Sequence, residues 1–193
     1  MILIETERLL LREIDYTDAN DLFEMDSDPE VHLFIENKPV KTIDEITKGI
    51  EIIKMQYKKN GIARWAVVDK ISNECVGWSG LKYYNQPINN HNNFYDLGYR
   101  FKKKHWGKGF ATESSIAILN YGFRNLDINS IYAITDPNNT ISKKVLSKLG
   151  FVFQETFDYE GDPTDWFKLI KSTWENTMSN ALTSDLSSGT NQL

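Results

Sequence analysis

The sequence predicts a mixed α/β (α+β) domain built around a mostly antiparallel sheet, and three observations carry this prediction. Apolar runs over residues 63–69, 74–84 and 94–101 follow one another across polar connections, as antiparallel strands do. Residues 41–61 repeat apolar side chains at three- and four-residue spacing, which is typical of an amphipathic helix. Residues 94–136 resemble a strand–helix–strand unit, so their two strands should be parallel and joined by a right-handed crossover.

Apolar runs, helix-capping residues and helix-ending residues predict the N-terminal elements. Residues 7–14 are leucine-rich and predict a strand. A helix is expected within residues 15–28, with Thr17 or Asp18 as its N-cap. The helix at 41–61 should open with a capping box of Thr42 and Glu45 and end at Asn60-Gly61.

The C-terminal elements complete the sheet. Residues 128–136 alternate as a strand, and residues 139–150 predict a short helix that ends at Gly150. Residues 151–157 and 165–170 are expected to pair as antiparallel strands. The sheet should therefore have six to seven strands, including one parallel pair, with about four flanking helices.

The chain should fold as one domain over residues 1–171, with a C-terminal tail at 172–193. The tail is rich in serine, threonine and asparagine. Trp174, Met178 and Leu182 predict a short helical stripe, and disorder is expected from Ser184 onward.

Composition narrows the class of protein. The 193 residues are 40% hydrophobic and carry a net charge of −5, which is typical of a globular protein and disfavours a broad nucleic-acid surface. No segment approaches the roughly 20 apolar residues that span a membrane, and the N-terminus is too acidic for a signal peptide. The single cysteine, Cys75, lies in a predicted strand and should be buried. The three histidines lack metal-ligand spacing, so no metal is expected, and a cytoplasmic location is predicted.

The segment "HWGKGFATES" at residues 105–114 places glycines where a helix begins. Gly107 and Gly109 could let backbone N–H groups turn toward an anion at the helix N-terminus. Lys108 and the lysines of 102–104 add positive charge. The spacing matches neither a Walker loop nor a dinucleotide fingerprint, so a plain tight corner stays open as an alternative.

A second strand-to-helix turn lies at "DPNNTISKKVLSKLGF", residues 136–151. Asn139 could present its amide to the gap between the two parallel strands, and Ser142 would lie in the first helical turn. On composition alone, Asn139 could equally be an N-cap and Ser142 an ordinary first-turn residue. Together the two turns suggest a cleft for a long phosphorylated cofactor.

These two segments resemble the GCN5-related N-acetyltransferase (GNAT) superfamily, in the branch of the ribosomal-protein N-terminal alanine acetyltransferases. The family signature Gln/Arg-x-x-Gly-x-Gly/Ala corresponds to residues 104–109, where Lys104 departs from the first position. The resemblance begins at "TERLLLRE", covers about residues 6–171 and implies a GNAT-type fold with a splayed parallel pair. It also implies acetyl-CoA as the co-substrate.

The resemblance implies a coenzyme site by position. Backbone N–H groups of the glycine turn would hold the pyrophosphate, the strand end near Tyr99 would pair with the pantetheine arm, and Asn139 would hydrogen-bond that arm. The full set of implied coenzyme-binding residues is Tyr99, Arg100, Phe101, Lys104, His105, Trp106, Gly107, Lys108, Gly109, Ala111, Thr112, Asn139, Ser142 and Lys144.

The implied reaction is direct acetyl transfer to a primary amine. Many family members use a tyrosine in the helix after Asn139 to protonate the leaving thiolate, but this helix has none. Ser142 matches the serine of the ribosomal branch and is the candidate proton donor. The general base is open among Asp96, Asp136, Glu155 and Asp158, each of which could equally be a surface or turn residue.

The acceptor site should lie between the early helices and the C-terminal strand pair, with residues 29–40 as a lid. Its candidate aromatic residues, each of which could equally belong to the core, are Phe34, Trp65, Trp78, Tyr83, Tyr84 and Trp166.

The acceptor is expected to be a protein N-terminus or a small amine, and the protein to be a monomer or homodimer without membrane or nucleic-acid partners. Two alternatives stay open. One is detoxification of polyamines or aminoglycosides. The other is a coenzyme A-binding module without turnover, which the lack of an obvious base favours.

Overall fold

The computed structural model describes residues 3–35 and 37–188, with side chains for 4–35 and 37–180. Its strands are β1 (Leu3–Glu5), β2 (Leu9–Glu13), β3 (Arg64–Asp69), β4 (Glu74–Tyr84), β5 (Phe94–Phe101), β6 (Ser130–Thr135), β7 (Val152–Tyr159) and β8 (Asp162–Ile170). Its α-helices are α1 (Ala19–Asp26), α2 (Ile43–Asn60), α3 (Phe110–Asn125), α4 (Thr140–Lys148) and α5 (Lys171–Ser188). Two 3-10 turns, η1 (Tyr16–Asp18) and η2 (Lys103–His105), precede α1 and α3.

The strands form one sheet in the order β1-β2-β3-β4-β5-β6-β8-β7. Every neighbouring pair is antiparallel except β5 and β6, which are parallel. The predicted fold class and its single parallel pair are therefore confirmed. The described sheet has eight strands rather than six or seven, because β1 is only three residues long and too short to give an alternating pattern.

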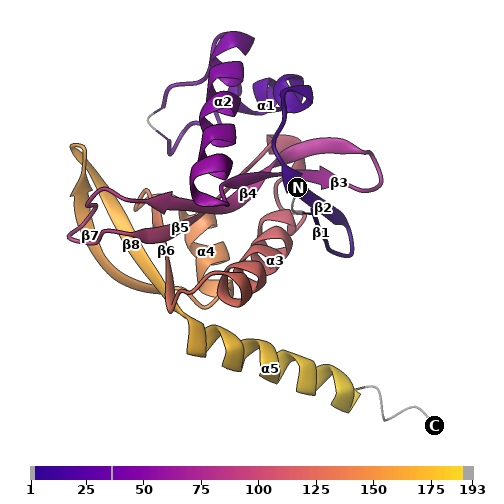
Figure 1. Ribbon diagram of the computed structural model, residues 1–193, viewed down its shortest axis with the longest axis vertical. Helices are drawn as coiled ribbons and strands as arrows, with labels where there is room; N and C mark the ends of the chain where they lie inside the picture. Colours follow the sequence, from indigo (N-terminus) through magenta and orange to yellow (C-terminus); the bar gives the residue numbers. More distant parts are fainter. Residues whose placement is uncertain (1–2, 36, 189–193) are drawn as a thin grey trace.

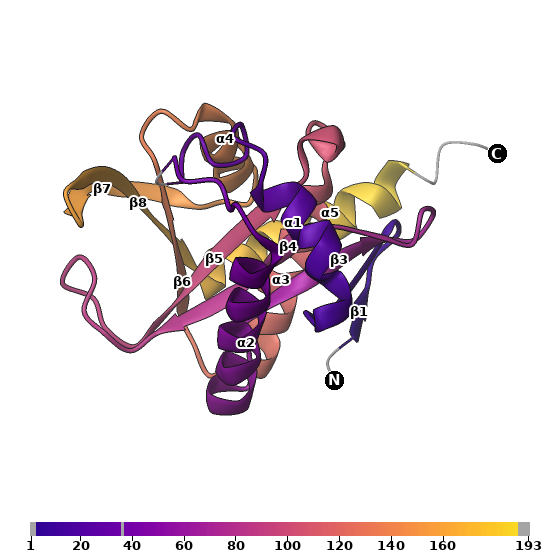
Figure 2. The same ribbon diagram turned by 90° about the horizontal axis from the view of Figure 1, so that it is seen from above.

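Helices cover both faces of the sheet (Figures 1 and 2). On one face, α3 and α4 pack on a core that includes Leu81, Leu97 and Ile118. On the other face, α1 and α2 pack on a smaller core around Met25 and Ile50. Along β4, Cys75 packs on the smaller core and Val76 on the larger one, because successive strand residues point to opposite faces.

Local sequence signals explain the helix ends. Thr42 and Glu45 form the predicted capping box at the start of α2, and Gly61 ends this helix with a left-handed φ of 72°. The predicted helix within residues 15–28 consists of a 3-10 turn followed by α1, and Asp18 is the N-cap residue of α1, although its side chain makes no capping hydrogen bond. Asp15 caps the 3-10 turn, and its carboxylate accepts the N–H of Tyr16. Among the described residues, no helix is both long and apolar enough to cross a membrane.

The C-terminal helix leaves the body of the protein (Figure 1). Trp174 anchors its first turns: the indole is buried in the main core, and its N–H donates to Asn120 Oδ1 at 3.1 Å. The helix extends to Ser188, past the short stripe predicted, because no proline or glycine interrupts residues 171–188. Residues 189–193, to which the prediction of disorder also applies, lie outside the described residues.

The parallel pair is the feature that positions the site. Asp96 and Tyr132 are the single residue pair that joins β5 to β6 in the described sheet. Beyond this pair the two strands separate, and among the described residues no strand pairs with the β6-facing backbone edge of β5 from Gly98 to Phe101. A cavity of about 180 Å³ occupies the gap. Its walls come from both faces of the sheet, since they include Trp78 of the α1–α2 side and Leu146 of the α4 side.

Candidate active site

The glycine turn begins α3 with left-handed backbone. Gly107 has φ of 74° and Gly109, the N-cap residue, has φ of 82°. Glu113 donates the first backbone hydrogen bond of the helix, to the carbonyl of Gly109 at 3.0 Å, so the amides of residues 110–112 have no acceptor within the helix. A Cβ at Gly107 would meet no heavy atom within 4 Å. The glycine is therefore required by backbone conformation and leaves open space beside the turn.

Arg8 fixes this turn from the neighbouring β1–β2 connection. Its guanidinium donates to the carbonyl of Lys108 at 2.9 Å and to the carboxylate of Glu113 at 2.7 Å. Thr6 Oγ1 also donates to Glu113, at 2.5 Å. The "TERLLLRE" segment and the "ATE" segment thus meet in space, which holds the turn and the first helical turn as one rigid unit.

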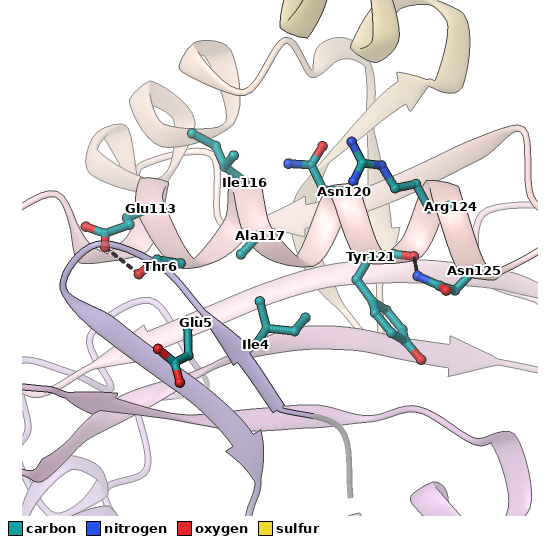
Figure 3. Close-up of a pocket in the computed structure, with 10 residues that line it drawn as sticks. All are labelled: Ile4, Glu5, Thr6, Glu113, Ile116, Ala117, Asn120, Tyr121, Arg124 and Asn125. Atoms are coloured by element: carbon teal, nitrogen blue, oxygen red, sulfur yellow. Dashed lines mark hydrogen bonds between the residues drawn. The ribbon is translucent and has the colours of Figure 1, made fainter.

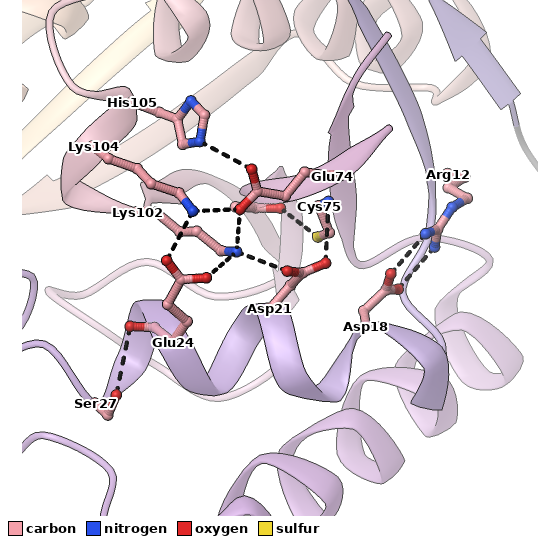
Figure 4. A network of polar contacts seen from close by, with 11 residues as sticks. Arg12, Asp18, Asp21, Glu24, Ser27, Glu74, Cys75, Lys102, Lys104 and His105 are labelled. Atoms are coloured by element: carbon pink, nitrogen blue, oxygen red, sulfur yellow. Dashed lines mark hydrogen bonds and ion pairs between the residues drawn. The ribbon is translucent and has the colours of Figure 1, made fainter. Parts of the chain in front are cut away.

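Two of the lysines before the glycines, Lys102 and Lys104, face a cluster of carboxylates (Figure 4). Lys102 is 2% exposed, and its Nζ lies 2.7–2.8 Å from Asp21, Glu24 and Glu74. These three carboxylates lie close enough together to hold a metal ion, but the Lys102 ammonium occupies the space between them.

Neighbouring basic residues join this cluster. Lys104 pairs with Glu24 and Glu74 at 2.9 and 2.7 Å, and His105 Nε2 lies 3.6 Å from Glu74. Burial raises the pKa of Glu74, but Lys102 and Lys104 outweigh it and lower this pKa to about 2. The side chains of Lys104 and His105, which the sequence placed at the coenzyme, therefore point into an ion-pair cluster. Much of the positive charge expected around the turn is balanced there.

The other basic and aromatic residues of the turn are more open. Trp106 is 41% exposed, and its indole N–H donates to the carbonyl of Phe101 at 2.8 Å, which fixes the ring beside the turn. Lys108 and Lys144 are both exposed.

The second turn brings Asn139 and Ser142 to the cavity. Asn139 is the N-cap of α4, and its side-chain oxygen accepts the N–H of Ser142 at 3.0 Å. Asn139 is therefore an N-cap, as one interpretation of the sequence has it. It also lines the cavity, so the second interpretation, in which its amide faces the gap, stays open. Ser142 Oγ lies 3.1 Å from the hydroxyl of Tyr99, and both residues also line the cavity.

The opposite side of the gap carries two guanidinium groups stacked on one indole. Arg64 lies 4.8 Å from the ring centroid of Trp78, and Arg100 lies 5.2 Å from it. Arg64 also pairs with Asp96 Oδ2 at 2.9 Å, and Arg100 pairs with Asp26 Oδ1 at 2.7 Å. This arrangement fixes the indole plane and leaves each cation with its own carboxylate.

Three of the six aromatic candidates line the cavity, namely Phe34, Trp78 and Tyr84. Tyr83 instead donates to Asn93 and packs on Tyr95, because alternation along β4 turns it to the opposite face from Tyr84. Trp65 and Trp166 are each 1% exposed and belong to the core, which is the alternative that the sequence left open for every aromatic candidate.

Only one of the four candidate bases lines the cavity. Asp96 does so, and its burial raises its pKa, while Arg64 opposes this rise. Asp136 and Asp158 accept backbone N–H groups inside their own turns, and Glu155 accepts from Asn89. These three carboxylates have local structural roles.

A larger groove, about 460 Å³ in volume, lies between β1 and α3 (Figure 3). Ile4, Thr6, Glu113 and Tyr121 are among its lining residues, and none of the predicted site residues lines it. Asn139 and Ser142 of the second turn line the smaller cavity instead, together with Tyr99 and Arg100 near the end of the strand that leads into the glycine turn, so the chemistry expected from the sequence belongs there.

The sequence matches the Acetyltransferase (GNAT) domain family over residues 8–152. This match spans both strand-to-helix turns and most of the chain. The chain belongs to the GNAT acetyltransferase family. It is therefore an acetyl-CoA-dependent acetyltransferase.

Individual relatives agree with this assignment. An uncharacterized N-acetyltransferase, p20, from Bacillus licheniformis is 34% identical over 146 residues, covering 76% of this chain and 80% of the relative. A GNAT-family acetyltransferase structure from Bacillus anthracis is 25% identical with a TM-score of 0.72, covering 89% and 99% of the two chains.

Two further solved structures share the fold of this GNAT chain. A ribosomal L7/L12 alpha-N-protein acetyltransferase in complex with coenzyme A has 17% identity and a TM-score of 0.71, covering 88% and 98% of the two chains. A spermidine N-acetyltransferase from Vibrio cholerae, in complex with CoA and spermine, has 19% identity and a TM-score of 0.69, covering 88% and 99%. At these identities the two structures support the fold alone.

The sequence reasoning missed Arg64 as part of the site. Arg64 reaches its position because Gly98 on β5 has no side chain, and a Cβ there would lie 2.3 Å from Arg64 Nη1. Gly98 pairs with Gly80 across β4 and β5. Two facing glycines inside strands signal a close approach of another group, and this was the available clue.

Proposed function

We propose that this GNAT enzyme moves the acetyl group of acetyl-CoA to the α-amine of a peptide or protein N-terminus, or of a small amine of similar charge. The observation that carries the proposal is the gap between β5 and β6. Its 180 Å³ cavity is lined by the start of α4 on one side and by aromatic and guanidinium side chains on the other. A donor and an acceptor could thus meet from opposite sides of the sheet.

The coenzyme would bind along the α3–α4 side. The free N–H groups of residues 110–112 fit a pyrophosphate, which also favours the positive end of the helix dipole. The unpaired edge of β5 at residues 98–101 fits the pantetheine arm as an added strand. Asn139 can offer its side-chain amide to the same arm, and the exposed Lys144 is available to a coenzyme phosphate.

In the proposed reaction the neutral amine attacks the thioester carbonyl carbon. A C–N bond forms, the C–S bond breaks, and the sulfur leaves with its electron pair. A backbone N–H of the free β5 edge would stabilise the oxyanion, and Ser142 would donate a proton to the leaving sulfur. The amine would lose its protons to water, because Asp96, the cavity-lining candidate base, is already bound to Arg64.

The charges of the acceptor side favour an α-amine over a polyamine. Arg64 and Arg100 flank Trp78, and the nearby Asp96 and Asp26 are already paired with them. A second ammonium on the acceptor would have to lie against these guanidinium groups, whereas a carbonyl or carboxylate next to the amine would be attracted to them. A cytoplasmic location stays a prediction.

A thiol-release assay tests this proposal. Acetyl-CoA is offered with N-terminal peptides, free amino acids, spermidine and an aminoglycoside, and acetylated products are identified by mass spectrometry. We expect turnover with α-amines and at most weak turnover with spermidine. Preferred acetylation of spermidine would instead support the detoxification alternative. Saturable coenzyme A binding without transfer to any amine would support the binding module.

A further inference from the structure

The side chain of Tyr99 meets Ser142 inside the cavity, although 43 residues separate them in the chain. The Tyr99 hydroxyl lies 3.1 Å from Ser142 Oγ and 3.2 Å from the Ser142 carbonyl oxygen. Tyr99 comes from β5 and Ser142 from the first turn of α4. A tyrosine hydroxyl thus reaches Ser142 from a strand, whereas the helix after Asn139 contains no tyrosine.

The contact limits where the Ser142 proton points: either hydroxyl can be the donor, and the Ser142 carbonyl is a second acceptor for the Tyr99 proton. A serine hydroxyl rotates to suit its partners, so an isolated serine in a first helical turn has no fixed proton direction. When Tyr99 donates its proton to Ser142 Oγ, the serine proton must point away from the tyrosine. The residues around this pair line the cavity, so the remaining direction is toward the gap. Ser142 is held at the same time by its N–H bond to Asn139 Oδ1.

We propose that Tyr99 is a positioning residue that orients the Ser142 hydroxyl toward the leaving sulfur and resupplies its proton. This inference rests on the proposed function. As the C–S bond breaks, the sulfur takes the Ser142 proton, and the Tyr99 proton moves to Ser142 Oγ. The tyrosine regains a proton from the one that the acceptor nitrogen releases through solvent. The products are the acetylated amine and the free thiol, with both hydroxyls restored.

The environment of Tyr99 keeps its proton in place between turnovers. Burial raises the pKa of the Tyr99 hydroxyl to about 12, so the group stays protonated at neutral pH. Tyr95 provides a matched control. It lies on the same face of the same strand, packs on the same core, and contacts the Tyr83 ring, without a hydrogen bond from its hydroxyl to any described residue.

The test compares Tyr99→Phe with Tyr95→Phe, alone and combined with Ser142→Ala, using acetyl-CoA and the best amine of the panel. We expect Tyr99→Phe to lower kcat by about 10-fold or more, with the KM for acetyl-CoA within about two-fold of wild type. Tyr95→Phe should change neither constant. In the Ser142→Ala background, Tyr99→Phe should have no further effect, because the two hydroxyls act as a unit.

Three results would overturn the inference. One is equal kcat in the Tyr99→Phe and Tyr95→Phe variants. Another is a Tyr99→Phe effect of the same size in the Ser142→Ala background. The third is a Tyr99→Phe variant with a lower Tm and a higher KM but an unchanged kcat, which would assign Tyr99 a structural role. All three leave the proposed function intact. A wild-type protein that acetylates no amine overturns the proposed function, and the inference with it.

Discussion

The two sides of the β5–β6 gap differ in how they are built. On the α3–α4 side, the expected coenzyme contacts come from short continuous segments: one turn supplies Gly107 and Gly109, and another supplies Asn139 and Ser142. The α1–α2 side is assembled from separate elements, with Phe34 from a loop, Arg64 from β3, Trp78 from β4 and Arg100 from β5. Backbone geometry defines the first side, whereas side-chain pairing across strands defines the second.

This difference indicates where specificity for the acceptor can change. The left-handed glycines and the helix caps depend on local sequence, so they tolerate little variation. The acceptor side depends on which side chains stand on which strand face, and single substitutions there leave the backbone unchanged. The following experiments separate the two sides, from the largest expected effect to the smallest.

Replacing Arg64 should affect stability most. Its guanidinium bonds the carbonyl of Gly80 and the Asp96 carboxylate, so Arg64→Met leaves a buried charge unpaired. We expect a loss of about 3–5 kcal/mol in the free energy of unfolding, measured by urea denaturation. The double variant Arg64→Met/Asp96→Asn should recover part of this loss. If the double variant is as unstable as the single variant, the ion pair is not the cause.

Removing the Ser142 hydroxyl should affect turnover next. Ser142→Ala keeps the backbone N–H that caps α4 through Asn139, so the fold should persist. We expect kcat to fall about 100-fold while the dissociation constant for acetyl-CoA stays within about two-fold. Ser147→Ala, an exposed serine of the same helix, is the matched control. An unchanged kcat would make Ser142 a simple helix-start residue.

Trp78→Leu tests the acceptor side alone. The substitution keeps an apolar side chain but removes the ring on which Arg64 and Arg100 stack. We expect the KM for the acceptor amine to rise about 10-fold, with the acetyl-CoA constant unchanged. A rise in the KM for acetyl-CoA would instead mean that a substitution on the acceptor side also disturbs the coenzyme side.

Glu74→Gln should give the smallest effect, and one that depends on pH. The folded-state pKa of Glu74 is about 2 against an ordinary value of 4.5. A carboxylate with a lowered pKa stabilises the fold above about pH 4.5, and this contribution is lost as the pH falls toward 2. The wild-type free energy of unfolding should therefore fall more steeply over this range than that of the variant. If the free energies of unfolding of the wild type and of Glu74→Gln fall equally between pH 4.5 and 2, the ion-pair account is contradicted.

The contrast between the two sides also explains what the sequence could predict. Both strand-to-helix turns, the capping box of α2 and the parallel pair depend on local patterns, and all four are present in the structure. The three-residue β1 was missed because a strand that short carries no period.

The side-chain partners were harder to predict. The pairing of Lys102 with Asp21, Glu24 and Glu74 depends on strand register and on how α1 lies against the sheet. The same is true of Tyr99 and Ser142, and of the opposite orientations of Tyr83 and Tyr84. Residue composition gave the aromatic candidates, but only the fold separates Phe34, Trp78 and Tyr84 from the buried Trp65 and Trp166.

The most direct test of the two-sided site is acetyl-CoA binding by Gly107→Val, measured by titration calorimetry. Its control is Gly61→Val, because Gly61 also has a left-handed φ and open space around its Cβ position but lies at the end of α2. We predict that Gly107→Val raises the dissociation constant about 10-fold or more and that Gly61→Val leaves it unchanged, although both variants carry similar backbone strain. Equal acetyl-CoA affinity in wild type and both variants would contradict a coenzyme site at the glycine turn.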